Sequence, residues 1–287
     1  MDGIILINKE KGISSFGVVS KMRKIFNIKK VGHCGTLDPE AMGVLPIMLG
    51  NATKVSKYLV EHDKEYVATL KLGIKTDSAD EEGKILEKSD FTLNENDEEF
   101  YKKQIMSFIG KSKQLPPMYS AIKVNGKKLY EYAREGKEIE REEREIEIYD
   151  IEVLKFDYNE NEIEFRVICS KGTYIRTLCE DISNKIGTIG YMKKLIRTKI
   201  DKFCIDESVL ISDLEKEENK EKYIIGIDKL FQENDEIILN DRKKELFLNG
   251  VKLTFDMPDG VYRIYNNKQF LGLGVLENKL LKRDVII

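Results

Sequence analysis

Tryptophan is absent from this sequence of 287 residues, and histidine occurs only twice, cysteine four times and proline five times. A structural zinc site is not expected, because such sites need grouped Cys and His ligands and the sequence has no CxxC pair. The cysteines lie far apart in a chain that is long enough to bury its own core, so no disulfide framework is needed. We therefore expect reduced thiols and a cytoplasmic protein.

Long apolar runs and an excess of one charge are missing as well. The best apolar run, Val44–Leu49, is interrupted by Pro46, whereas a membrane span needs about 20 apolar residues. The first residues have neither the basic region nor the apolar region of a signal peptide. The chain carries 48 Lys and Arg against 51 Asp and Glu, for a net charge of −3. A uniformly basic nucleic-acid-binding surface is thereby excluded, although a local one is not.

The motifs of common cofactor sites are also missing. The sequence has no GxxxxGK[ST] loop, no GxGxxG after a strand and no HExxH or GxSxG motif. We therefore expect no metal and no cofactor. Any chemistry is then expected to depend on carboxylate, tyrosine and arginine side chains.

Charge is unevenly distributed along the chain. Residues 1–36 contain seven Lys and Arg against two acidic residues, and residues 166–202 contain nine against three. Residues 77–108 have the opposite bias, with ten acidic and four basic residues. The two basic segments favour a shared face that binds a polyanion. On charge alone, ordinary solvated surfaces explain them equally well.

Periodicity and capping residues predict a mixture of strands and helices before residue 200. Asn125-Gly126 predicts a hairpin with a type I′ turn across 121–130. The expected strands are 3–8, 66–72 and 163–169. Three helices are expected: one that is capped by Ser14 or Ser15 and ends at Phe26, one over 97–109 and one over 173–186.

The last 55 residues or so have a different pattern. Short strand-like runs are separated by turn residues such as Asn249-Gly250, which suggests a small barrel. The expected strands are 236–239, 245–248, 251–255, 261–265 and 270–276, after a boundary near residue 230.

One irregular segment, residues 31–46, combines glycine and proline with reactive side chains. It holds His33, Thr36 and Asp38 and follows the first basic segment, and loops of this kind often carry catalytic residues. The simpler interpretation is that Asp38, which precedes Pro39, only forms a turn.

Five motifs together resemble the TruB family, the bacterial tRNA pseudouridine synthases that act on the T-loop. The strongest is GHCGTLDPEAMGVLPIMLGNATK, which is similar to the catalytic motif of that family. The others, in family order within residues 1–200, are LINKEKGISS, DKEYVATLKLGIKTDSADEEG, QLPPMYSAIKVNGKKLYEYAREG and CSKGTYIRTLCEDI. The resemblance weakens after residue 205, where only the strand pattern fits the PUA-type module of the family.

The resemblance implies a role for each matching residue. Asp38 is implied as the nucleophile, Tyr66 as the tyrosine that stacks on the target base and takes part in proton removal, and Arg176 as the partner of the aspartate. Substrate-binding roles are implied for His33, Tyr174, Met192, Lys9 and Lys123, with Lys123 on the gripping hairpin and Met192 as the apolar contact to the base. Two positions depart from the family: Glu10 replaces the usual proline, and Cys34 stands where Thr or Gly is common.

Taken singly, these residues have simpler explanations. Tyr66 suits a strand aromatic in the core, and Arg176 suits an exposed helical residue paired with Glu180. The hairpin lysines suit a solvated face. Given the resemblance, however, the Lys and Arg of the first helix and of residues 171–199 are expected to contact phosphates.

The resemblance implies an α+β fold, with a mixed, largely antiparallel sheet surrounded by helices and a small C-terminal PUA-like β-barrel. The expected domains are 1–230, with an RNA-gripping insertion at about 115–145, and 231–287. The implied activity is isomerisation of T-loop uridine 55 of tRNA to pseudouridine, with base flipping and an aspartate nucleophile. The expected partner is the tRNA T-arm, bound by a monomer. The alternatives are a non-catalytic tRNA-binding or tRNA-folding protein and an aspartate-nucleophile hydrolase, although no ligand cluster for the latter is found.

Overall fold

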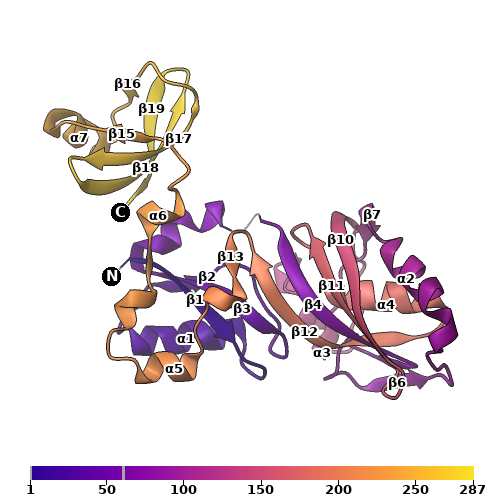
Figure 1. The fold of residues 1–287 in the computed structure, drawn as a ribbon. Coiled ribbons are helices and arrows are strands. Elements are labelled where there is room, and N and C mark those ends of the chain that lie inside the picture. The colour runs from indigo at the N-terminus through magenta and orange to yellow at the C-terminus, as the bar shows by residue number, and fades with distance from the viewer. Residues whose placement is uncertain (1, 60–61) are drawn as a thin grey trace.

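One large sheet forms the centre of the protein (Figure 1). The computed structural model describes residues 2–59 and 62–287. Ten strands pair in the order β14-β1-β3-β12-β4-β11-β10-β7, with β2 beside β3 and β13 beside β12. The strands are β1 (Gly3–Lys9), β2 (Val31–His33), β3 (Met42–Leu49), β4 (Lys64–Leu72), β7 (Gly110–Gln114), β10 (Arg144–Asp157), β11 (Glu162–Cys169), β12 (Gly190–Ile200), β13 (Phe203–Cys204) and β14 (Ile225–Gly226).

The predicted mixed, largely antiparallel sheet is confirmed. Strands β3 and β12 pair in parallel, through Ile196 with Met42 and Arg197 with Gly43, and the other pairings in this sheet are antiparallel. Gly43 has a φ of +105°, and a Cβ at that position would lie 2.2 Å from the Arg197 carbonyl oxygen. Only glycine allows β3 and β12 to approach this closely.

The continuous apolar run of β1 is explained by burial on both faces. Ile5 and Ile7 belong to the main core, which lies under α1 (Ser15–Ile25) and α4 (Ile175–Ile186). Ile4 and Leu6 point to a second core on the opposite face, which also contains residues of the 3-10 helix η1 (Gly50–Tyr58). A strand buried on both faces has no polar alternation, so the whole run is apolar.

The ends of the helices agree with their capping residues. The side chain of Ser14 accepts a hydrogen bond from the Gly17 N–H at 3.0 Å at the start of α1, and Gly187, with φ of +97°, ends α4. The predicted helix over 97–109 is α2 (Glu98–Met106), which is shorter than expected at its end, and Asp97 precedes it without a side-chain cap hydrogen bond. The other helices are α3 (Leu129–Arg134), α5 (Ile211–Lys216), α6 (Ile227–Leu230) and α7 (Asp241–Leu248).

The predicted hairpin is confirmed within the segment 115–145. Strands β8 (Lys123–Val124) and β9 (Lys127–Lys128) pair around Asn125 and Gly126, whose φ values of +52° and +81° are those of a type I′ turn. Helix α3 follows the hairpin. A second small sheet pairs β5 (Ile74–Thr76) with β6 (Ile85–Lys88).

The C-terminal residues form a separate five-stranded sheet in the order β15-β17-β18-β19-β16 (Figure 1). The expected β-rich unit is confirmed as a curled sheet around its own small core. Its strands are β15 (Glu236–Ile238), β16 (Leu253–Thr254), β17 (Gly260–Asn266), β18 (Gln269–Glu277) and β19 (Leu280–Ile286).

One expectation for this unit was wrong, and one strand was missed. Residues 245–248 are not a strand but the end of helix α7, because the Asn240 side chain accepts a hydrogen bond from the Lys243 N–H at 2.9 Å and starts a helix. The strand β19 was not expected, since its sequence, LLKRDVI, alternates poorly. Short apolar runs do not distinguish helix from strand by periodicity alone.

The C-terminal unit also packs against the large domain. Leu273 and Val285 are buried in the second core described above. The Tyr58 hydroxyl donates a hydrogen bond to the Asp284 carboxylate at 2.6 Å, and Lys57 pairs with the same carboxylate. Burial of these apolar side chains makes the C-terminal unit part of the support of β1 and β3.

Candidate active site

The loop between β2 and β3 is held in place by residues from the first motif. The Ser15 hydroxyl donates to the Leu37 carbonyl and accepts from the Leu37 N–H, both at 2.9 Å. The Pro39 carbonyl accepts from the Lys9 ammonium at 2.8 Å and from the Gly12 N–H at 3.0 Å. The backbone on both sides of Asp38 is therefore fixed, whereas its side chain is 42% exposed.

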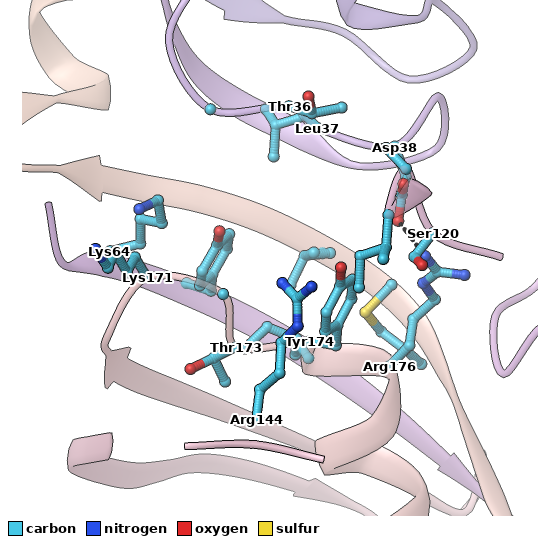
Figure 2. A pocket seen from close by; sticks show the side chains of 18 of the residues that line it. Thr36, Leu37, Asp38, Lys64, Ser120, Arg144, Lys171, Thr173, Tyr174 and Arg176 are labelled. Carbon is cyan, nitrogen blue, oxygen red and sulfur yellow. Dashed lines mark ion pairs between the residues drawn. The ribbon is translucent and has the colours of Figure 1, made fainter. Parts of the chain in front are cut away.

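Asp38 pairs with Arg176, from the first turn of α4, at 3.1 Å between Oδ2 and Nη2 (Figure 2). The Arg176 side chain is only 5% exposed. The interpretation of Arg176 as an exposed residue that pairs with Glu180 was therefore wrong. The buried guanidinium thus holds the exposed carboxylate by an ion pair at the edge of the cleft.

Further contacts fix the guanidinium of Arg176. It donates to the carbonyls of Tyr119 at 2.7 Å and Ser78 at 3.3 Å, and it lies 3.7 Å from the carboxylate of Asp80. Asp80 was not singled out from the sequence, although it stands in the tyrosine-containing motif. Arg176 thus bridges two carboxylates, and its position does not depend on Asp38 alone.

A cleft of about 790 Å³ opens beside this ion pair. Figure 2 shows Asp38 and Arg176 at one end of it and Lys64 and Lys171 at the other, with Tyr174 between. All predicted site residues except His33 and Lys9 line the cleft, namely Asp38, Tyr66, Lys123, Tyr174, Arg176 and Met192. Four separate sequence motifs therefore meet at one cavity of the size typical of ligand sites.

Tyr66 forms part of the floor of the cleft. It lies on β4, opposite Val167 of β11 and Arg197 of β12, and its side chain is largely buried. Desolvation raises the pKa of Tyr66 to about 12, and the nearby Arg197 guanidinium opposes that rise. Tyr66 packs in the core, as the simpler interpretation expected, and it also lines the cleft.

Tyr174 is fixed through its backbone at the start of α4. Its N–H donates to Oε1 of Gln114 at 2.8 Å, and Nε2 of Gln114 donates to its carbonyl at 3.0 Å. The amide of Gln114, at the end of β7, thus takes the place of an ordinary helix cap. The phenol ring is left to line the cleft.

Two apolar residues of β12 line the cleft together. Met192 was expected there, while Leu195 was not singled out. Residues three apart on a strand normally point to opposite faces, but a bulge between Met192 and Lys194 brings both side chains to the same face. The sequence contains no clear signal for this bulge.

Three predicted substrate-binding residues occupy different surroundings. Lys123 is exposed on β8, at the rim of the cleft. Lys9 is fully buried, and desolvation lowers the pKa of its ammonium to about 8. His33 lies on β2, and its buried Nδ1 has no hydrogen-bond partner in the described part of the chain. Burial, followed by the Arg197 charge, lowers the pKa of His33 and favours its neutral form.

The expectation that the basic residues of 171–199 contact phosphates was wrong for Arg197, whereas Arg176 was expected to pair with the aspartate. Arg176 is paired within the site, and Arg197 is fully buried. Among the residues that the structure describes, no cluster of His, Cys, Asp and Glu side chains is arranged to hold a metal ion. The four cysteines are free thiols.

Two family models match the chain. A family model described as TruB family pseudouridylate synthase (N terminal domain) matches residues 23–175, and one described as tRNA pseudouridylate synthase B C-terminal domain matches residues 176–237. This chain belongs to the TruB family. The resemblance seen in the five sequence motifs is thereby confirmed, and membership of the TruB family makes the chain a pseudouridine synthase, which is an isomerase.

Relatives of the TruB family cover nearly the whole chain. The tRNA pseudouridine synthase B of Clostridium acetobutylicum is 47% identical over 289 residues, with 98% of each chain covered. The protein of the same name from Alkaliphilus oremlandii is 44% identical over 287 residues, with 97% of this chain and 94% of that chain covered.

Solved structures support the same fold. A chain in a Cbf5-Nop10-Gar1 complex is 26% identical, with a TM-score of 0.70 over 99% of this chain and 83% of that chain. A chain in an H/ACA RNP bound to a substrate RNA containing 2′-deoxyuridine is 23% identical, with a TM-score of 0.71 over 99% of this chain and 85% of that chain, and this similarity concerns the fold. Within the described residues, none of the helices is both long enough and apolar enough to span a bilayer.

Proposed function

We propose that this chain converts uridine 55 in the T-loop of tRNA to pseudouridine, with Asp38 as the nucleophile. The observation that carries the proposal is the pair of Asp38 and Arg176 at the edge of a cleft that also contains Tyr66. The similarity to proteins named tRNA pseudouridine synthase B supports tRNA as the substrate.

The reaction breaks the N1–C1′ bond of uridine and forms a C5–C1′ bond. No electrons are gained or lost overall, and the C5 proton is replaced while N1 gains one. An ionised carboxylate at the nucleoside provides covalent catalysis, either at C1′ or through elimination. Tyr66 is proposed to take the C5 proton, which leaves the C–H electron pair to restore the C5=C6 double bond.

The target base has to leave its stack to enter the cleft. Flipping a base costs a few kcal/mol, and contacts with aromatic and apolar side chains offset that cost. Tyr66, Tyr174, Met192 and Leu195 are proposed to supply these contacts. His33 and Lys9 are proposed to act on the RNA from beside the loop, and Lys123 from the hairpin.

Release of tritium from C5-labelled uridine tests the proposal directly. A tRNA transcript labelled at C5 is expected to lose one tritium for each pseudouridine formed, and a transcript with uridine 55 replaced by cytidine is the matched control. Tritium release from the wild-type transcript but not from the control supports both the reaction and the position. RNA binding without release would instead indicate the non-catalytic tRNA-binding alternative.

We further propose that the protein acts as a monomer, with residues 1–230 as the catalytic domain and 231–287 as an RNA-binding domain. Exposed cations of the second domain are proposed to reach phosphates beyond the T-loop. Arg242, Lys252 and Lys268 are the best candidates, because each is exposed. Truncation is a poor test of this role, since Leu273 and Val285 also support the catalytic domain.

Neutralising these three cations together, as Arg242→Gln, Lys252→Gln and Lys268→Gln, is expected to raise the Michaelis constant for full tRNA. If all three side chains contact phosphates, a plot of the logarithm of the binding constant against the logarithm of salt concentration should lose roughly two units of slope. The single-turnover rate at saturating RNA should stay near wild type. A T-arm hairpin should be affected less than full tRNA, and equal effects on both would contradict the proposed division of roles.

A further inference from the structure

The site contains a second buried arginine, and its surroundings differ from those of Arg176. Arg197 of β12 is fully buried, and no carboxylate in the described part of the chain pairs with it. Its Nε donates to the Val44 carbonyl at 2.9 Å, and its Nη2 donates to the Gly35 carbonyl at 3.0 Å. Arg197 therefore ties β12 to β3 and to the first residues of the loop that holds Asp38.

The third nitrogen of this guanidinium makes no hydrogen bond in the described structure. Nη1 of Arg197 is buried and has no acceptor in good hydrogen-bond geometry. Tyr66 is the cross-strand partner of Arg197 on β4; desolvation raises the pKa of the Tyr66 hydroxyl, and the nearby Arg197 charge opposes that rise. Both N–H groups of Nη1 are thus left without an acceptor, on a side chain whose cross-strand partner is Tyr66.

Three basic side chains surround Arg197. Lys9 of β1, His33 of β2 and Lys64 of β4 all have a pKa lowered first by desolvation and in part by the Arg197 charge. The neighbouring groups that gain negative charge on losing a proton are Tyr66 and Cys34. Of these two, only Tyr66 lines the cleft.

A buried cation without a counter-ion is costly, and an anion that forms next to it removes part of that cost. The surroundings of Tyr66 include Arg197 from β12, Cys169 from β11 and Asp38 from the loop. Arg197 is the cation among them. Negative charge on the Tyr66 oxygen is therefore favoured by a donor that is already in place, which is the arrangement that stabilises developing charge in catalysis.

We propose that Arg197 is a positioning residue for the isomerisation, which holds the Tyr66 oxygen and stabilises its anionic form during proton transfer at C5. The proton of the Tyr66 hydroxyl leaves to solvent, the phenolate oxygen then accepts the C5 proton, and Arg197 itself neither gains nor loses a proton. This inference rests on the proposed function. It also explains why an arginine without a carboxylate partner is buried where β3, β4 and β12 meet.

The test compares single-turnover tritium release by the full-length wild type, Arg197→Lys and Arg197→Met between about pH 6 and pH 9. Arg197→Met is expected to react about 10²-fold more slowly at neutral pH, with its rise in rate displaced to higher pH. Arg197→Lys keeps a buried cation, so its rate is expected to fall less than that of Arg197→Met. RNA affinity should not change, because Arg197 does not line the cleft.

A double-mutant comparison separates this role from simple support of the fold. If Arg197 acts through the Tyr66 hydroxyl, Arg197→Met should slow the Tyr66→Phe enzyme by no more than about threefold. Additive losses with an unchanged pH profile would overturn the proposal. Should Arg197→Met not fold by circular dichroism, the same comparison is made with Arg197→Lys.

Arg166→Lys is the matched control. Arg166 pairs with Glu65, Asp150 and Glu152, and it does not line the cleft. Its substitution is expected to leave both rate and pH profile unchanged. Absence of tritium release from the wild type would instead contradict the proposed function itself, so the two failures are distinguishable.

Discussion

Asp38→Asn is expected to lower pseudouridine formation by roughly 10⁴-fold or more, because the amide is nearly the same shape as the carboxylate but is a poor nucleophile. The fold should survive the change. Arg176 keeps its contacts with Asp80 and with the carbonyls of Ser78 and Tyr119. The loop backbone remains held by Ser15 and Lys9.

The affinity of Asp38→Asn for tRNA should stay within about tenfold of wild type, a difference of at most about 1.4 kcal/mol. Tritium release and RNA binding, measured on the same preparation, check both expectations. Asp90→Asn carries the same chemical change at an exposed position outside the cleft and should behave as wild type. Parallel loss of binding and activity would mean that Asp38 only forms the turn before Pro39, and substantial activity would refute its role as nucleophile.

Tyr66→Phe is expected to reduce turnover by about 10²–10⁴-fold, which is the usual contribution of a general base. The ring that packs in the floor of the cleft remains, so RNA affinity should be retained. Because desolvation raises the pKa of Tyr66 to about 12, the wild-type rate should increase with pH through the neutral range as the phenolate fraction grows. Tyr66→Phe should lose that increase.

Tyr101→Phe is the matched control for this change. Tyr101 is also a buried tyrosine, and its hydroxyl accepts a hydrogen bond from the Asn94 N–H at 3.3 Å, away from the cleft. We expect both variants to lose a similar amount of stability and only Tyr66→Phe to lose turnover. That result would show that the Tyr66 hydroxyl acts in the reaction and not only in packing. Wild-type turnover by Tyr66→Phe would show that Tyr66 is only a packing residue.

The sequence was sufficient where local chemistry controls the structure. Ser14 and Gly187 mark helix ends because capping depends on neighbouring residues, and Asn125-Gly126 marks its turn because few residues tolerate positive φ. The TruB family motifs predicted Asp38, Tyr66, Lys123, Tyr174 and Arg176 as site residues, and all five line one cleft. Each motif is a contiguous stretch, so it is readable before the chain folds.

Predictions from the sequence failed where one local pattern is compatible with two structures. Residues 245–248 were expected to form a strand, yet the hydrogen bond at Asn240 and packing against β19 and β16 make them helical. Likewise, the bulge after Met192 turns Leu195 to the cleft, because strand register depends on the partner strand.

Only the tertiary structure determined which groups surround the two arginines of the site. Two arginines of the same basic segment are both buried, but Arg176 meets the carboxylates of Asp38 and Asp80, whereas Arg197 meets carbonyls and the phenol of Tyr66. These contacts join residues that are far apart in the chain. The electrostatic role of a side chain depends on what surrounds it once water is excluded, and neither residue type nor spacing contains that information.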